Sequence, residues 1–210
     1  MSPLHEVLRM PRLRAPALAE LTAPLILSAA LLASGPASAA KAELMSAALT
    51  LDEPGERPGL FIEAHYEFDL PMPLIDAMHR GIALYFKYEF GLSRERWYWL
   101  NKDVAESTFN IRLAFNPLTR RYAVSYSGIS LNFDTLDEAL PYIKNIRRWR
   151  VAASDAAAGS NYQAEIRFSL DTGKLPKPMQ VTNHDSGDWT VESSWEPVAI
   201  PEDVRRAAGE

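Results

Sequence analysis

The 210-residue sequence contains no cysteine. This absence excludes disulfide bonds, cysteine-ligated metal sites and thiol-based catalysis. It also excludes a lipid anchor attached to an N-terminal cysteine. The stability of the chain must therefore come from the burial of a hydrophobic core.

Glycine is also scarce, since there are only ten glycines and none of them cluster. Phosphate-binding loops and the nucleophile elbow of α/β-hydrolases both depend on closely spaced glycines. The paired histidines of a zinc-protease helix are absent as well, and the four histidines are scattered along the chain. We therefore expect no enzymatic activity, no cofactor and no metal ion.

One histidine leaves a catalytic alternative open. His184 is followed directly by Asp185 and shortly afterwards by Asp188. Neighbours in sequence do not make a triad, because the base must meet a hydroxyl in space while a carboxylate orients its other nitrogen. A hydrolase that uses His184 is accordingly the least favoured of the functional hypotheses.

A second group of polar residues occupies every other position of a predicted strand, so its side chains share one face of that strand. Side chains two residues apart on a strand are separated by about 7 Å, which is too far for neighbours alone to hold a transition metal. We interpret this group as a solvated polar face; its members are Glu63, His65, Glu67 and Asp69.

Long apolar runs are missing after residue 39, and the region before it has a different character. Three arginines within residues 9–14 precede an apolar segment at residues 21–33, and small residues follow it. This order is typical of a secretory signal peptide, and the apolar segment is shorter than the roughly 20 residues that span a bilayer. We therefore expect residues 1–39 to be a signal peptide, cleaved after Ala39 or Ala40, and the protein to be exported to the periplasm.

Basic residues are outnumbered, with 22 lysines and arginines against 27 acidic residues. Residues 1–39 hold three of the arginines and two of the glutamates, so the exported chain has a net charge of about −6. An acidic chain lacks the positive field that nucleic acid requires. We expect no nucleic-acid partner, and we expect the chain to be soluble once the signal peptide is removed.

The exported part is dominated by an alternation of apolar and polar residues. Within residues 60–70, Ile62 and Tyr66 share one parity, while Glu63 and Glu67 share the other. A period of two predicts strands with one buried face. Comparable segments occur at 42–51, 81–92, 106–115, 121–133, 149–151, 161–170 and 189–195.

Helical patterns are few and short, at residues 71–81 and 134–146. Two short helices cannot cover a parallel sheet, so we predict an all-β fold, an antiparallel two-layer β-sandwich of the immunoglobulin-like type. A closed barrel is the alternative arrangement. The predicted single domain spans residues 40–200, and the charged tail at 201–210 is expected to fray.

The first candidate binding surface is an aromatic–arginine stretch in which Trp97, Tyr98 and Trp99 follow Arg94 and Arg96. Consecutive strand residues point to opposite faces, so the core cannot hold all three rings. Exposed rings beside arginines suit a sugar face, an anionic headgroup or a protein hot spot. The alternative is that the two tryptophans close one end of the core.

The second candidate is a basic patch in which Lys144, Arg147, Arg148 and Arg150 surround Trp149. Guanidinium groups favour phosphate and carboxylate. The expected ligands are an envelope phospholipid, the phosphate of lipid A or an acidic partner surface. The alternative is a solvated helix-to-strand junction whose cations pair with the many carboxylates of the chain.

Three segments carry a resemblance to a known family: "LYFKYEFGLSRERWYWLNKDVAE", "IRLAFNPLTRRYAVS" and "LDTGKLPKPMQV". The chain resembles, from about residue 44 to residue 198, a family of exported Gram-negative bacterial proteins of unknown function, sometimes labelled proline-rich signal peptide proteins. Members are often encoded beside a nitrogen-regulation-type membrane sensor kinase and a ribosomal RNA methyltransferase. The resemblance implies a periplasmic accessory role and brings no catalytic residue with it.

The leading hypothesis is a non-enzymatic periplasmic binding or accessory protein. Its partner is expected to be a protein, such as the periplasmic domain of a sensor kinase, or an envelope glycan or lipid. A carbohydrate- or lipid-binding module is the alternative: a concave groove of rings favours sugar, and an apolar cavity between sheets favours lipid.

Overall fold

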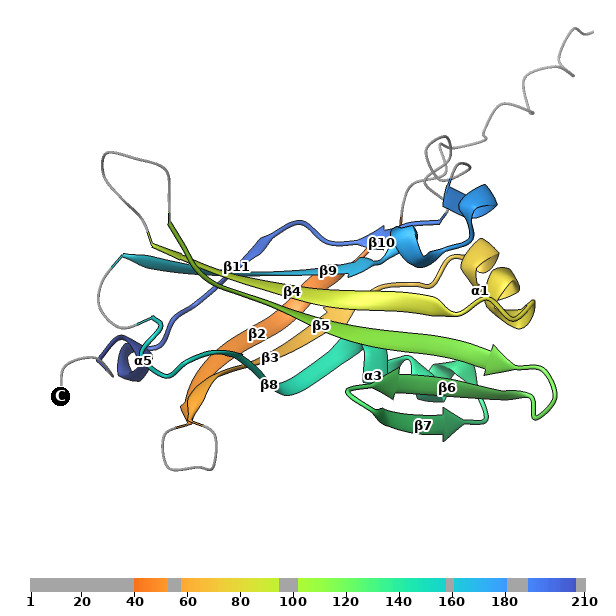
Figure 1. Ribbon diagram of the computed structural model, residues 1–210, viewed down its shortest axis with the longest axis horizontal. Coiled ribbons are helices and arrows are strands. Elements are labelled where there is room, and N and C mark those ends of the chain that lie inside the picture. Colours follow the sequence, from red (N-terminus) through yellow and green to blue (C-terminus); the bar gives the residue numbers. More distant parts are fainter. Residues whose placement is uncertain (1–39, 53–57, 95–101, 158–160, 181–188, 207–210) are drawn as a thin grey trace, which may run out of the picture. The chain divides into compact units, whose positions relative to one another are not determined.

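The computed structural model describes residues 40–52, 58–94, 102–157, 161–180 and 189–206. All of them belong to one compact unit, residues 36–210. The predicted signal peptide at residues 1–39 lies outside the described residues. The described part is mostly β, with two open sheets and a few short helices (Figure 1).

The larger sheet has eight strands and is built around the long strands β4 (Leu84–Arg94) and β5 (Lys102–Asn116). Its remaining strands are β6 (Arg121–Tyr126), β7 (Ile129–Phe133), β9 (Tyr162–Leu170), β10 (Val191–Glu192), β1 (Ala40–Lys41) and β11 (Glu196–Val198). The strand order is β1-β10-β9-β4-β5-β6-β7, with β11 also pairing with β9. Among the described strands, every pair is antiparallel except β1 and β10, which are parallel, so the antiparallel prediction fails at that edge.

The smaller sheet contains β2 (Glu43–Asp52), β3 (Gly59–Glu67) and β8 (Asn145–Ala152) in the order β2-β3-β8. Its strands cross those of the larger sheet at an angle (Figure 1). Both neighbours of β3 are antiparallel to it, although β8 follows much later in the chain. The small sheet therefore needs a long-range pairing to be complete.

The alternation of apolar and polar residues along β4 matches the burial of one face of that strand. Leu84, Phe86, Tyr88, Phe90 and Leu92 are all at most 1% exposed, while the residues between them are partly exposed. Each buried side chain of this size contributes roughly 1.5–3 kcal/mol relative to an exposed one. The sequence prediction for this strand is confirmed.

The core lies between the two sheets, and a cluster of aromatic rings within it is surrounded by aliphatic side chains. Tyr66 and Phe68, from β3 and its C-terminal extension, stack on Phe168 of β9 with ring centroids 5.4 and 5.1 Å apart. Phe168 in turn stacks on Phe86 of β4 at 5.7 Å. Aromatic pairs at such separations add about 0.5–1.5 kcal/mol each to the burial of their area. One ring thus contacts side chains from both sheets.

The helices are α1 (Met72–His79), α2 (Leu136–Ala139), α3 (Pro141–Lys144), the 3₁₀ turn η1 (Thr172–Lys174) and α5 (Glu202–Arg206). The first was predicted, and the second predicted helix is divided into α2 and α3. Thr135 caps α2 by accepting from the Glu138 backbone N–H at 3.2 Å, and Pro141 begins α3 because it needs no N–H partner there. No helix in the described ranges combines the length and the apolar character needed to cross a membrane.

The C-terminal region departs from prediction in three places. The expected strand at residues 189–195 is a strand only at Val191–Glu192, because the Ser193 hydroxyl then accepts from the Phe168 N–H at 3.0 Å where a strand would offer a carbonyl. Residues 177–180, which lie outside the two predicted helices, form a helical turn. The expected fraying from residue 201 is wrong for residues 202–206, since α5 buries Val204 completely.

Candidate functional site

The predicted basic patch lies on β8, and an irregularity in that strand arranges its arginines. The pairing of β3 with β8 shifts by one residue between Ile62 and Ala64. Arg148, on the opposite strand, has φ of +48°, in the left-handed region that glycine usually occupies. The extra residue is a β-bulge, which places both Arg147 and Arg148 on the surface.

Two of the three arginines are engaged by the protein itself. Arg148 donates to Asp52 Oδ2 at 2.6 Å and lies over the Phe61 ring at 5.2 Å. Arg150 donates through two nitrogens to the Pro58 carbonyl, at 3.2 and 3.0 Å. Both side chains therefore hold the end of the β2–β3 hairpin. This agrees with the alternative in which the cations of the patch are paired within the protein.

Lys144, at the end of α3, is also engaged. Its Nζ donates to Glu67 Oε2 at 2.6 Å and lies 5.3 Å from the centre of the Phe68 ring. The hydrogen bond from Lys144 and its positive charge lower the pKa of Glu67. This ion pair fastens α3 to β3.

Arg147 is the exception in the basic patch. It is exposed, and among the described residues it has no hydrogen-bond or ion-pair partner. A guanidinium without an internal partner retains its five donors for a ligand. Arg147 is also the one member of the patch that borders a cleft.

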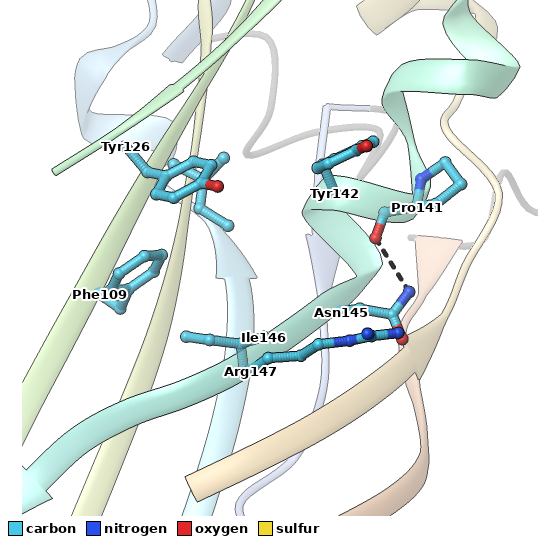
Figure 2. A pocket seen from close by; sticks show the side chains of 8 residues that line it. Phe109, Tyr126, Pro141, Tyr142, Asn145, Ile146 and Arg147 are labelled. Carbon is cyan, nitrogen blue, oxygen red and sulfur yellow. Dashed lines mark hydrogen bonds between the residues drawn. The ribbon is translucent and has the colours of Figure 1, made fainter. Parts of the chain in front are cut away.

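The cleft lies where the two sheets diverge and has a volume of about 440 Å³. Figure 2 shows Phe109 and Tyr126 on one wall, with α3 and the start of β8 forming the other. That volume is within the range of roughly 300–1,000 Å³ typical of small-molecule sites. The lining residues are Phe109, Ile111, Tyr126, Pro141, Tyr142, Asn145, Ile146 and Arg147.

The inward-facing residues of β5 and β6 make the apolar wall. Phe109 contacts Tyr126, with ring centroids 5.8 Å apart, and contacts the buried Trp149 at 5.9 Å. Tyr142 stands on the opposite wall and is 45% exposed, supported by Phe133 at 4.7 Å. Large rings with one free side are typical of ligand-binding surfaces.

The opposite wall is fixed by the end of α3. The Asn145 side-chain amide donates to the Pro141 carbonyl at 2.9 Å (Figure 2), and the backbone N–H of Asn145 donates to the same oxygen. The chain then enters β8 directly, so Asn145, Ile146 and Arg147 follow one another along the cleft. The described lining includes no carboxylate, histidine or lysine that could act as a general base.

Among the other predicted site residues that the structure describes, none lines this cleft. Arg94 ends β4 and lies over the Tyr162 ring at 5.6 Å on the neighbouring strand. Arg96, Trp97, Tyr98 and Trp99 lie outside the described residues, and so do His184, Asp185 and Asp188.

The predicted polar face on β3 is a local network. His65 Nε2 is 3.1 Å from Glu67 Oε1, and Lys144 approaches the same carboxylate. In the described part of the chain, no three histidine or acidic side chains are grouped in a way that suits a metal ion.

Sequence reasoning found Arg147 but missed the aromatic wall of the cleft. Phe109 and Ile111 follow the pattern of core residues, and the sequence alone gives no sign that the sheets separate beside them. Tyr142 is the one available signal, since a tyrosine beside the proline of a short amphipathic helix has no obvious core position.

A family model described as Domain of unknown function (DUF4390) matches residues 39–199. No curated protein and no solved structure matches the chain.

Proposed function

The chain belongs to the DUF4390 family, and we propose that it is a non-enzymatic binding protein of the cell envelope that takes an anionic amphiphile into the cleft between its sheets. The observation that carries the proposal is the unpaired Arg147 at the edge of an aromatic cleft. The export signal expected in residues 1–39 would place this function in the periplasm.

The chemistry of the two walls supports this class of ligand. The aromatic and aliphatic side chains of the cleft favour an acyl or other apolar segment, which gains about 25 cal/mol per Å² of buried surface. Arg147 favours a carboxylate or phosphate, because a guanidinium binds both through two parallel hydrogen bonds. A ligand with both parts is an anionic amphiphile, which agrees with the lipid alternative of the sequence analysis.

The other members of the basic patch limit how much positive charge is available to a ligand. Arg148, Arg150 and Lys144 already have partners, so one cation remains available rather than four. A single free guanidinium suits one anionic headgroup better than an extended polyanion.

The architecture supports the proposal through the layered packing of the sheets. We infer that the two sheets are the layers of a sandwich, because core rings such as Phe168 contact both of them. The immunoglobulin-like strand order receives no such support, since β4, β5, β6 and β7 form a consecutive meander within one sheet. A cleft at one edge is what two diverging layers produce.

The proposal is tested by titrating the protein with a single-chain phosphate amphiphile, a fatty acid and an uncharged monoacylglycerol. The wild-type protein should bind both anionic ligands more tightly than the uncharged one. Arg147→Gln should weaken the binding of both anionic ligands about tenfold, equivalent to about 1.4 kcal/mol. It should leave the affinity for the uncharged ligand unchanged.

The matched control is Arg80→Gln, because Arg80 is exposed, has no side-chain partner among the described residues and lies outside the cleft. Equal affinities of the wild-type and Arg147→Gln proteins for the anionic ligands, or an equal loss in the control, would contradict the proposal.

A further inference from the structure

A second hollow lies on the face of the large sheet that points away from the core. It has a volume of about 450 Å³ and is centred on Gly91, near the C-terminal end of β4. Gly91 pairs with Glu106 on β5 and with Glu165 on β9. We call this hollow the Gly91 trough, because the missing side chain leaves the backbone as its floor, with one glutamate on each side.

Trp195 forms one wall of the trough and is 43% exposed. An ideal Cβ on Gly91 would lie 3.8 Å from Cζ3 of the indole ring. The segment that carries the ring is anchored on both sides. Ser193 is hydrogen-bonded to the backbone of Phe168, and Glu196 pairs with Ile166.

The indole is held in place by a further contact. The Arg167 guanidinium lies over the ring, 4.8 Å from its centroid, and donates two hydrogen bonds to Glu89 at 3.0 and 2.7 Å. Burial alone would raise the pKa of Glu89, but the hydrogen bonds from Arg167 and Lys87 outweigh it and lower that pKa. The ring is thus presented as a fixed platform, which reduces the entropy that a ligand must overcome.

The charged groups that line the trough are all carboxylates, and the remaining polar side chains there are the hydroxyls of Ser93, Ser107 and Thr108. Glu106 and Glu165 are exposed and have no ion-pair or hydrogen-bond partner in the part of the chain that the structure describes. Since neighbouring strands are about 4.8 Å apart, the backbones of the two glutamates are separated by about 10 Å, with the bare floor between them. Carboxylates only accept hydrogen bonds, so a suitable ligand must carry several donors and no negative charge.

We propose that the Gly91 trough binds a short glycan without anionic groups. One sugar ring lies on the floor above Gly91 with its C–H face against Trp195, and its hydroxyls donate to Glu106 and Glu165. A peptide is a poorer fit, because β4 is a central strand whose neighbours occupy both of its edges and leave no place for strand addition. This site is separate from the cleft beside Arg147, which uses the opposite, inward-facing side chains of the same sheet.

The test is calorimetric titration of the full chain with triacetylchitotriose and cellotriose as uncharged probes, and with trigalacturonic acid as an anionic probe. At least one uncharged trisaccharide should bind, and the anionic one should not. Gly91→Ala should fold normally, since the added methyl makes an ordinary contact with the ring, and should weaken glycan binding about tenfold by filling the floor.

Two further variants and a control complete the experiment. Trp195→Ala should weaken binding about tenfold, and Glu106→Gln about fivefold, because a neutral amide is a weaker acceptor than a carboxylate. Glu63→Gln, at an exposed glutamate on the small sheet, should change nothing. If Trp195→Ala misfolds, Gly91→Ala still decides the question.

Three results would overturn the inference: no binding of either uncharged trisaccharide at millimolar concentration, equal binding by the wild-type and Gly91→Ala proteins, or preference for a lysine-rich peptide over both glycans. Arg147→Gln distinguishes this site from the proposed amphiphile cleft, because it should leave glycan affinity unchanged even where it abolishes amphiphile binding.

Discussion

Two tyrosines in the core, Tyr66 and Tyr88, share complete burial and differ in the fate of their hydroxyls. Tyr88 donates to the Ile143 carbonyl at 2.8 Å, which links β4 to α3. The Tyr66 hydroxyl makes no hydrogen bond of good geometry among the described residues, and its nearest polar neighbour is the Ser193 hydroxyl. Burial raises the pKa of Tyr66 to about 12 and raises that of Tyr88 as well, so both phenols are neutral near pH 7.

The two hydroxyls should therefore differ in their contribution to stability. Tyr88→Phe removes a buried donor and leaves the Ile143 carbonyl unpaired, which should lower the free energy of unfolding by about 1–3 kcal/mol. Tyr66→Phe removes a buried hydroxyl whose contact with Ser193 is weak, and it should be neutral or stabilising. Urea denaturation of both variants measures the difference, and a larger loss for Tyr66→Phe would contradict the assignment of the bonds.

At the scale of elements, the bulge in β8 is the feature on which the cleft depends. It places Arg147 beside the cleft and sends Arg148 towards Asp52. A residue other than glycine in the left-handed region costs about 1–2 kcal/mol. Arg148 occupies that conformation, so the ion pair with Asp52 and the contact with Phe61 offset backbone strain.

Paired substitutions at Arg148 isolate this strain. Arg148→Ala and Arg148→Gly both remove the guanidinium, so they differ mainly in backbone preference. The glycine variant should be more stable than the alanine variant by about 1 kcal/mol in thermal or urea unfolding.

Arg150 provides the matched control, because it lies in the same strand with no positive φ. There the order should reverse, with glycine less stable than alanine, since glycine weakens an ordinary strand. An alanine variant at position 148 as stable as the glycine variant would show that the bulge relaxes when the side chain is lost.

The sequence predicted the elements where one pattern governs the local structure. The alternation in β4 and β3 was sufficient, because burial of one face decides both the strand and its orientation. Sequence patterns failed at residues 177–180, where no helix was predicted, and at Ser193, whose hydroxyl replaces a backbone acceptor. The bulge at Arg148 could not be predicted, since an arginine in that conformation carries no local signal.

At the scale of the whole molecule, Phe168 joins the two sheets. It stacks on Phe68 and Tyr66 from one side and contacts Phe86 and Tyr88 of its own sheet. With no cysteine in the chain, such contacts take the place of covalent links between the layers. The stability of each sheet should therefore depend on the other.

Truncation of this ring tests the dependence. Phe168→Ala should lower the free energy of unfolding by about 3–5 kcal/mol, as for other large-to-small core changes. Amide hydrogen exchange should accelerate in β3 and β4 together, because the two sheets open as one cooperative unit. Faster exchange confined to one sheet would contradict the shared core.

The candidate sites also belong to this scale, which is why the sequence indicated them only in part. Arg147 was identified from the density of arginines, but its cleft requires side chains from β5, β6 and α3 to meet. The Gly91 trough combines a glycine on β4 with Trp195, far away in sequence, and only the strand register brings them together. Patterns within a segment report on burial, whereas sites arise from the meeting of distant segments.

The parallel pair of β1 with β10 has a consequence for the order of events during synthesis. Ala40 pairs with Val191, so β1 cannot pair until a segment about 150 residues further along the chain has been synthesised. The equilibrium cost of so long a closure is small, since each doubling of loop length adds only about 0.6 kcal/mol. In time, however, β1 remains unpaired at this edge of the large sheet until residues 191–192 are available, so this pair cannot form before the intervening strands have emerged.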